Sequence, residues 1–190
     1  MGKKRSIKMA SAHTKKSKWN LKVNPKELAI RALDPEKDLN FILSSWLQSY
    51  RDSEFAISVP NDLYFHYHQQ LIVQILTHKN NSVTVLVSPE DQDQIMGYIV
   101  YNVKKPIVYY VYMKYPFRRL GLARYLFEGV KNHFRRSAGE DSENENIVFE
   151  CTHKPRKWRE LSRTLDLKYN PYIVREAEEA DEEKDESSDS

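Results

Sequence analysis

The sequence predicts an α/β (α+β) domain in which a mixed β-sheet of about six to seven strands is flanked by helices. Three observations support this fold class. Short apolar or β-branched runs alternate with longer segments whose apolar residues recur every three or four positions, as in amphipathic helices. A polar turn containing Pro89 separates two strand-like runs and indicates a hairpin. A glycine-containing turn, residues 118–123, joins a strand-like run to an amphipathic helix.

The first part of the domain is predicted to hold one strand and two helices. The strand spans residues 28–33, and Asp34 then offers an N-cap carboxylate before Pro35 at the first helical position. A second helix is predicted over residues 62–78. The apolar stripe that we expect this helix to bury contains Leu63, Tyr67, Leu71 and Ile75. Both helices are therefore expected to pack on the sheet.

The second part alternates strands with helices. Strands are predicted over residues 82–87, 95–103, 107–113, 147–152 and 167–174, and helices over about 119–134 and from Pro155 onwards. Gly97 lies inside one of these strands, which marks a place where another backbone or a ligand comes close. The strand 107–113 leads straight into the glycine-containing turn.

Both ends of the chain are strongly charged, although the formal net charge is only +3. Residues 1–22 carry eight Lys or Arg and no acid, whereas residues 175–190 carry nine Asp or Glu. Neither end has enough apolar surface to offset the entropy of ordering. We therefore expect a basic flexible tail (1–24), a folded domain (25–174) and an acidic flexible tail (175–190). The basic tail is either a solvated solubility element or an arm that binds nucleic acid or an acidic protein.

Several classes of protein are disfavoured by composition. No apolar run approaches the roughly 20 residues of a membrane span, and the N-terminus lacks the apolar core of a signal peptide. Cys151 is the one cysteine, so no intramolecular disulfide forms, which favours a reducing, cytoplasmic setting. His66 and His68 point to different faces of a helix and do not make a paired metal site. We expect no metal and no membrane contact.

The glycine-containing turn consists of Arg118, Arg119, Leu120, Gly121, Leu122 and Ala123. Backbone N–H groups at a helix N-terminus lack acceptors within the helix, and the positive end of the helix dipole favours anions. Gly121 lets a ligand approach the backbone, Ala123 keeps the next turn slim, and the arginines add positive charge. These six residues are therefore expected to hold the phosphate or pyrophosphate of an anionic cofactor.

The element order, with this turn after the fourth strand, resembles the GNAT superfamily of acyl-CoA-dependent N-acyltransferases over roughly residues 28–174. The signature Arg/Gln-x-x-Gly-x-Gly/Ala is matched by Arg118, Gly121 and Ala123. The resemblance implies a sheet split into a V between the fourth and fifth strands, with acetyl-CoA in the gap. The pantetheine arm would pair with the backbone near Met113. The pyrophosphate would lie on the amides of the turn.

Transfer of an acetyl group to an amine needs a neutral amine and a proton donor for the leaving thiolate. A lysine side chain with a pKa near 10.4 is neutral only about 0.04% of the time at pH 7, so a base helps. Glu150, the carboxylate inside the fifth strand, is the candidate base, or else a structural carboxylate held by an arginine or water. Tyr169 is the candidate acid, with Tyr172 and Tyr110 as alternatives.

The later part of the family pattern is altered, because Pro155 and Ser162 stand where many members carry asparagine and tyrosine. His153 is expected to be an exposed loop residue, and a nucleophilic role for Cys151 is disfavoured. The resemblance implies an N-acetyltransferase that transfers an acetyl group from acetyl-CoA to an amine of a protein or small molecule. The alternative is a catalytically silent GNAT-like module whose charged tails dock on nucleic acid or a protein partner.

Overall fold

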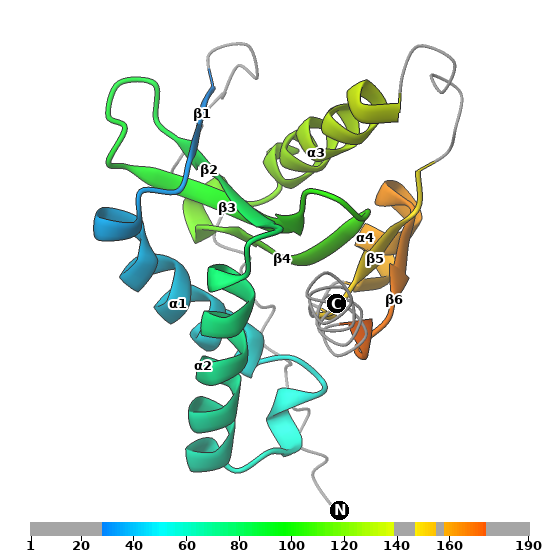
Figure 1. Cartoon of the computed structure of the whole chain (residues 1–190). Coiled ribbons are helices and arrows are strands. Elements are labelled where there is room, and N and C mark those ends of the chain that lie inside the picture. The colour runs from blue at the N-terminus through cyan, green and yellow to red at the C-terminus, as the bar shows by residue number, and fades with distance from the viewer. Residues whose placement is uncertain (1–27, 139–146, 155–157, 174–190) are drawn as a thin grey trace, which may run out of the picture.

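The computed structural model describes residues 28–138, 147–154 and 158–173. Both predicted tails and Pro155 lie outside these residues. The described chain forms one six-stranded sheet in the order β1-β2-β3-β4-β5-β6, with helices on both faces (Figure 1). None of the described helices is long and apolar enough to cross a bilayer. The predicted fold class, a mixed sheet flanked by helices, is confirmed.

The strands are β1 (Ala29–Ala32), β2 (Asn81–Val87), β3 (Ile95–Asn102), β4 (Ile107–Met113), β5 (Phe149–Cys151) and β6 (Leu167–Tyr169). The helices are α1 (Pro35–Arg51), α2 (Asn61–Thr77), α3 (Leu122–Ala138) and α4 (Trp158–Leu165), with short 3-10 turns η2 (Ala56–Ser58) and η3 (Tyr115–Phe117). Neighbouring strands from β1 to β4 are antiparallel, and β4–β5 and β5–β6 are parallel. The order of elements is the one predicted.

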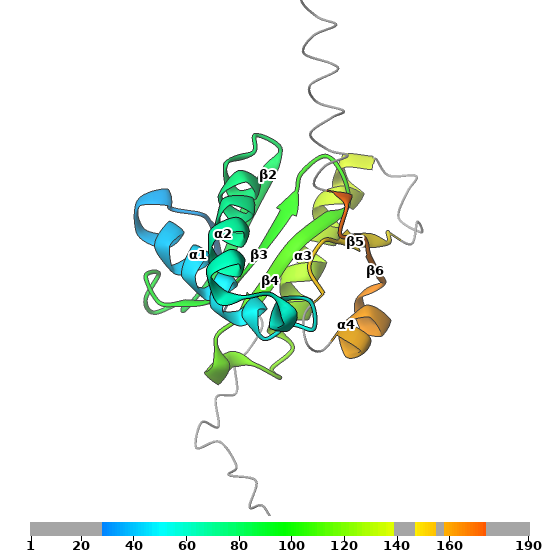
Figure 2. The same cartoon turned by 90° about the horizontal axis from the view of Figure 1, so that it is seen from below.

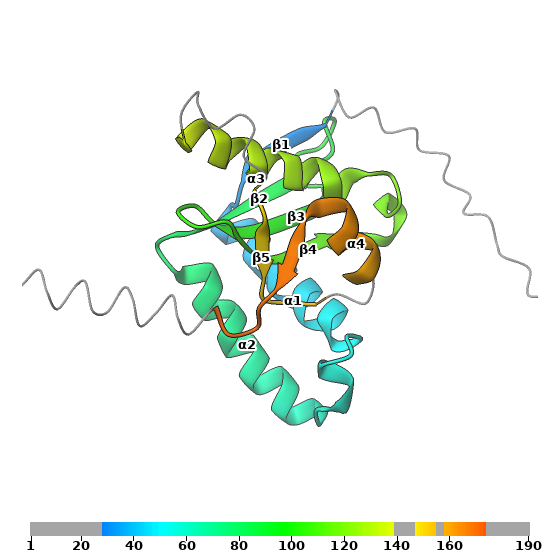
Figure 3. The same ribbon diagram turned by 90° about the vertical axis from the view of Figure 1, so that its right-hand side faces the viewer.

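Two apolar cores lie on opposite faces of the sheet. Helices α1 and α2 cover one face, and their core includes Trp46, Ile72 and Tyr98, all fully buried. Helices α3 and α4 cover the other face, where Leu122 and Phe149 are buried. Figure 3 shows α3 on one side of the sheet and α1 and α2 on the other. The alternation of side chains along each strand therefore supplies both cores.

The start of α1 follows the sequence prediction. The Asp34 carboxylate accepts a hydrogen bond from the Glu36 amide at 3.1 Å, and Pro35 occupies the first turn. The buried Asp38 carboxylate then accepts two hydrogen bonds from Arg31 of β1, at 2.5 and 2.9 Å. The hydrogen bond from Arg31 lowers the pKa of Asp38. This pair holds the first strand against the first helix.

Helix α2 is rotated relative to the prediction. The side chains that it buries are Tyr64, His68, Ile72 and Ile75. Leu63 and Tyr67, which we expected in the core, are 46% and 63% exposed. The Tyr64 hydroxyl donates to the Leu47 carbonyl of α1 at 2.8 Å, and this bond fixes the rotation of the helix. The predicted stripe was therefore wrong at Leu63 and Tyr67, which lie one position away from buried residues, whereas Ile75 is buried and Leu71 is half-buried against the core.

Several boundaries differ from the prediction. Helix α3 begins at Leu122, because Arg119 and Gly121 have φ values of 66° and 78°, which an α-helix does not accommodate. Strand β5 is shorter than predicted at both ends. Strand β6 ends at Tyr169, since the Asn170 side chain accepts from the Tyr172 amide and turns the chain. The close approach predicted at Gly97 is confirmed, since a Cβ there would lie 2.5 Å from the Tyr112 carbonyl oxygen.

Candidate active site

Within the described residues, strand β4 is paired with β5 only at its own beginning, by the last two residues of β5. Ile107 lies opposite Glu150 and Val108 opposite Cys151, and no further register pair joins the two strands within the described residues. A side-chain hydrogen bond, from the Thr152 hydroxyl to the Tyr109 carbonyl at 3.3 Å, follows the last backbone pair. Figure 1 shows β5 and β6 diverging from β4 beyond this point. The sheet is therefore split, as the resemblance implies.

A β-bulge in β4 accounts for the split. Tyr101 lies opposite Val108 and Val100 opposite Tyr110, so Tyr109 is an extra residue in β4. Both Tyr109 and Tyr110 belong to the core under α1 and α2, although consecutive strand residues normally alternate between faces. Bulges bend the strand that contains them. The bulge therefore turns the rest of β4 away from β5.

Beyond the bulge, the edge of β4 that faces the gap carries unpaired backbone groups. The Lys114 amide donates to the Met96 carbonyl across the β3–β4 ladder at 2.9 Å. In an antiparallel ladder, residues that bond across alternate with residues whose N–H and C=O groups point the other way. Val111 and Met113 are of the second kind, so their backbone groups point toward the gap. An extended molecule can pair with this edge as an added strand.

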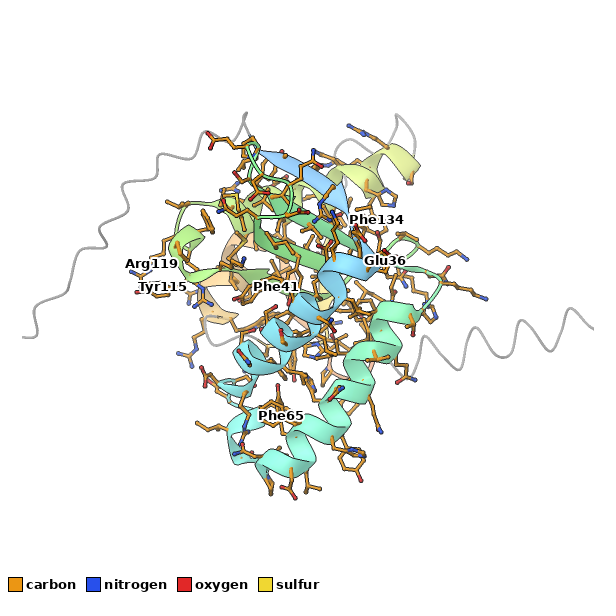
Figure 4. All side chains as sticks on the ribbon, turned by 90° about the vertical axis from the view of Figure 1, so that its left-hand side faces the viewer. Glu36, Phe41, Phe65, Tyr115, Arg119 and Phe134 are labelled. Carbon is orange, nitrogen blue, oxygen red and sulfur yellow. The ribbon has the colours of Figure 1, made fainter. Side chains whose placement is uncertain are left out.

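The loop between η3 and α3 presents free amides at the wide end of the gap. Within the described residues, no protein group accepts a hydrogen bond from the amides of residues 119–124. A Cβ built on Gly121 would meet nothing within 4 Å, so the backbone is open to solvent there. Left-handed residues such as Arg119 and Gly121 are typical of loops whose successive N–H groups surround an anion. Figure 4 shows Arg119 beside Tyr115 at this edge of the molecule.

Arg118 joins this loop to the end of β4. Its Nε donates to the Met113 carbonyl at 2.8 Å. Its guanidinium carbon lies 6.0 Å from the Tyr112 ring centre and 5.9 Å from that of Tyr115. The side chain of Arg118 therefore lies along the strand end, and Arg119 is the more freely projecting charge.

A small cavity of about 10 Å³, no more than the space of one water molecule, lies in the gap itself. Its lining comes from β4, α3, β5, α4 and β6 and consists of Val108, Tyr109, Tyr110, Val111, Phe127, Cys151, His153, Trp158, Leu161 and Leu167. Burial raises the pKa of the Cys151 thiol to about 12. Cys151 is therefore protonated at neutral pH, which argues against a nucleophilic role.

A larger cavity of about 410 Å³ lies on the α1–α2 side. It is lined by Tyr50, Phe55, Val59, Leu63, Tyr64, Tyr67, His68, Leu71, Thr152, His153, Tyr169 and Pro171. None of these described lining residues is Asp, Glu, Lys or Arg. His153 lines both cavities, so the gap and the larger cavity meet at this side chain.

His153 is buried, with 5% of its surface exposed, so the expectation of an exposed loop residue was wrong. The Thr152 hydroxyl lies 2.7 Å from its Nδ1, and its ring centre lies 5.0 Å from that of Trp46 and 4.7 Å from that of Tyr50. Burial, and the nearby His68, hold the pKa of His153 well below its usual range. The imidazole is therefore neutral at pH 7.

The wall beside His153 is aromatic and uncharged. His68 stacks between Tyr50 and Tyr64, with ring centres 4.9 and 5.0 Å apart. Burial lowers the pKa of His68 to about 4 and raises the pKa of Tyr50 to about 12. The outer wall is held by Arg51, which donates to the carbonyls of Ala56 and Val59. These bonds fix the η2 turn against α1.

The two predicted catalytic residues lie in different places. Tyr169 lines the larger cavity, and burial raises its pKa. Glu150 lines neither cavity: its carboxylate lies 3.6 Å from Lys168 Nζ and 3.5 Å from Asn170 Nδ2. The sequence analysis expected an arginine or water beside a structural carboxylate at this position. The partners in the structure are a lysine and an amide. The structure does not bring Glu150 and Tyr169 into one cavity.

The alternative acids differ in access. Tyr172 is 69% exposed and lies outside both linings. Tyr110 lines the gap cavity, and its hydroxyl lies 2.7 Å from the Ser49 hydroxyl.

Among the described residues no group of three or more His, Cys, Asp or Glu is placed to hold a metal ion.

Sequence reasoning missed two features of the site. The bulge is signalled only by the adjacent Tyr109 and Tyr110, which interrupt the alternation of a strand. The position of His153 depends on how far β5 extends, and β5 ends at Cys151. Neither feature has a local pattern that distinguishes it from an ordinary strand or loop.

Comparison by sequence with protein-family models and with curated proteins gave no match. Similar folds occur among solved structures of acetyltransferases. A GNAT-family acetyltransferase from Staphylococcus aureus Mu50 is 13% identical, with a TM-score of 0.41 over 58% of this chain and 68% of that one. A ribosomal-protein-alanine N-acetyltransferase from Brucella melitensis biovar Abortus 2308 is 12% identical, with a TM-score of 0.46 over 72% and 89%. The PaiA N-acetyltransferase from Thermoplasma acidophilum, in complex with coenzyme A, is 12% identical, with a TM-score of 0.41 over 58% and 74%. The likeness to these three structures is one of fold.

Proposed function

We propose that the chain is an N-acetyltransferase that transfers an acetyl group from acetyl-CoA to an amine of a protein or small molecule. One observation carries this proposal: a loop of unpaired amides stands at the wide end of a split sheet, and one side chain, His153, lines both the split and a second cavity on the α1–α2 side. The amides suit the anionic head of a cofactor, and the split suits its extended arm. The second cavity suits an acceptor amine.

The cofactor would be held mainly by the backbone. Its pyrophosphate would accept hydrogen bonds from the amides of residues 119–123 at the start of α3, where the helix dipole also favours an anion. Its arm would pair with the outward-pointing backbone groups of Val111 and with the amide of Met113, whose carbonyl already accepts from Arg118. Free amides in both places support this arrangement. The thioester would then reach the part of the gap lined by His153.

In the reaction, the amine nitrogen attacks the thioester carbonyl carbon, the C–S bond breaks, and the amine loses a proton while the thiolate gains one. His153 lines both cavities, so we assign it the transfer of the amine proton; because burial holds its pKa well below the usual range, it passes that proton on to water or to the leaving thiolate and does not keep it. Tyr169 is the proposed donor to the thiolate. Glu150, the base predicted from the sequence, lines neither cavity and would act only through water.

The proposal is tested by titrating acetyl-CoA and CoA into the full chain by calorimetry. We expect a Kd in the micromolar range or tighter, a binding free energy of about −8 kcal/mol. Gly121→Glu should weaken binding at least about 100-fold, because it adds a negative charge and a side chain where the phosphates lie. Gly129→Glu adds the same charge further along α3, where a Cβ meets nothing within 4 Å, and should bind like the parent protein.

Millimolar or absent CoA binding by the parent protein would overturn the proposal. A second candidate is the catalytically silent binding module, which is favoured by the absence of a carboxylate from either lining among the described residues. Tight CoA binding without CoA release from acetyl-CoA in the presence of any acceptor amine would support that module instead.

A further inference from the structure

Provided that the chain is the acetyltransferase proposed above, we infer that its acceptor is an amine attached to a bulky aromatic or aliphatic group. That group would occupy the 410 Å³ cavity between the α1–α2 layer and the C-terminal strands, with the nitrogen next to His153. A cavity of this size is typical of sites that enclose a small organic ligand.

The wall formed by α2 is the first argument. Leu63, Tyr67 and Leu71 follow one another at four-residue spacing, so they form one stripe on the helix, and all three line the cavity. Tyr64 and His68 of the buried stripe also line the cavity, and Leu71 packs against the core as well, so the cavity borders the core along α2. Leu63 and Tyr67 remain 46% and 63% exposed, although large apolar groups on a monomer surface usually occur singly. An apolar ligand would bury them.

The walls of the cavity opposite α2 are also apolar. Phe55, from the η2 segment, is 58% exposed, and it faces the same space as Tyr169 and Pro171 from the end of the described chain. Figure 2 shows the α1–η2–α2 layer lying beside β5, β6 and α4. Three segments far apart in the sequence therefore present apolar surface to one cavity. Burying one aromatic ring in such a site contributes roughly 1.5–3 kcal/mol.

The charges around the cavity are the second argument. Its described lining contains no carboxylate that would balance an ammonium group. Glu54 and Lys154, which flank the lining in sequence, are paired with each other at 3.7 Å. The tyrosines and histidines of the wall are neutral, since burial moves the pKa values of Tyr50 and His68 away from neutral pH. A polyamine, or a lysine among other charges, would therefore be desolvated without a counter-charge.

The same chemistry occurs in two sources, a free amine with an aromatic group and a peptide whose first residue is aromatic. An α-amine with a pKa near 8 is neutral roughly a tenth of the time at pH 7, so it enters an uncharged cavity more readily than a lysine does. The cavity recognises the apolar group in either case. Experiment can separate the two sources.

The test measures CoA release from acetyl-CoA with the full chain and four acceptors. These are 2-phenylethylamine, a Phe-first tetrapeptide amide, spermidine, and an N-acetylated peptide rich in lysine. We expect kcat/KM to be at least about 100-fold higher for one or both aromatic amines than for the cations, which corresponds to the aromatic transfer energy of about 3 kcal/mol. A preference for 2-phenylethylamine or for the tetrapeptide identifies whether the acceptor is a free amine or a peptide. Equal or faster acetylation of spermidine or the lysine peptide overturns the inference.

Two variants on α2 locate the binding surface. Tyr67→Asp places a carboxylate in the lining and should lower kcat/KM for 2-phenylethylamine at least about tenfold. Phe65→Asp makes the same change at a residue of the same helix that is 40% exposed and lies outside the lining, and should leave kcat/KM unchanged. Equal effects of the two variants would contradict the assigned cavity.

A binding measurement keeps the inference separate from the proposed function. Ligand-observed NMR is recorded for 2-phenylethylamine and for spermidine with the parent protein, with and without CoA. Binding of the aromatic amine, reduced in Tyr67→Asp and not in Phe65→Asp, supports the inference even if no turnover is found. Absence of aromatic-amine binding overturns it even if CoA binds tightly, which leaves the cofactor proposal standing.

Discussion

The two faces of the split sheet differ in the kind of atom that they present. On the α3 face, the groups left free are backbone amides: those of residues 119–124 and those on the outer edge of β4. On the α1–α2 face, the groups left free are side chains, and most are aromatic or aliphatic. A backbone site suits a ligand with an anion and an extended arm, whereas a side-chain site selects its ligand by shape and polarity. One sheet can therefore hold two very different molecules end to end.

Both faces of the sheet depend on the pairing of β3 with β4. We expect Gly97→Val to disrupt this pairing. A Cβ at this position would lie 2.4 Å from Met113 Sδ and 2.5 Å from the Tyr112 carbonyl oxygen. We expect urea unfolding to show a loss of stability of about 3 kcal/mol or more, because a backbone atom must move. Gly129→Val, where a Cβ meets nothing, should change stability by less than about 1 kcal/mol. Similar stabilities for the two variants would contradict the close approach.

The point where the two cavities meet is tested by removing the imidazole. His153→Gln should lower kcat about 100-fold, the usual contribution of a proton-transfer group, and should leave the Kd for CoA nearly unchanged. Glu150→Gln serves as the comparison, because its carboxylate pairs with Lys168 outside both linings. We expect it to change kcat less than about threefold. If the two effects are reversed, Glu150 is the base and the assignment from the sequence is right.

The neutral aromatic wall should make the protein sensitive to acid. His68 takes up a proton near its ordinary pKa of 6.5 when unfolded but only at about 4 when folded, so the unfolded state binds more protons between these values. Stability therefore falls as pH falls, by about 2 kcal/mol between pH 7 and pH 5. Urea unfolding across this range measures the loss. His68→Phe should reduce this loss of stability, and His153 accounts for the loss that remains. An unchanged dependence of stability on pH in His68→Phe would contradict the burial of His68.

The smallest expected effect concerns the one side chain that orders the backbone site. Arg118→Gln removes the Nε hydrogen bond to the Met113 carbonyl, and we expect the Kd for CoA to rise about fivefold, which corresponds to about 1 kcal/mol. Arg118→Lys keeps the charge and loses that bond, so a similar loss would assign Arg118 to positioning. Arg136→Gln, at the far end of α3, is the charge control and should leave the Kd as it is. If Arg118→Lys has the Kd for CoA of the parent protein, the charge of this side chain alone matters for binding.

Local patterns in the sequence predicted most of the architecture. The N-cap at Asp34, the hairpin, the strand over residues 107–113 and the turn before α3 all depend on neighbouring residues, and the structure has each of them. The rotation of α2 could not be predicted, because either of two adjacent apolar stripes can face a core. A hydrogen bond to another helix, from Tyr64 to Leu47, decided between them.

Neighbouring residues were enough to predict the turn before α3, because glycine readily adopts the left-handed conformation that Gly121 has there. The larger cavity and the place of His153 depend on tertiary packing. Their walls come from α1, η2, α2 and the segments after β5 and β6, which meet through packing rather than through any spacing along the chain. Burial then made these histidines neutral, and burial depends on what the rest of the fold places around a side chain.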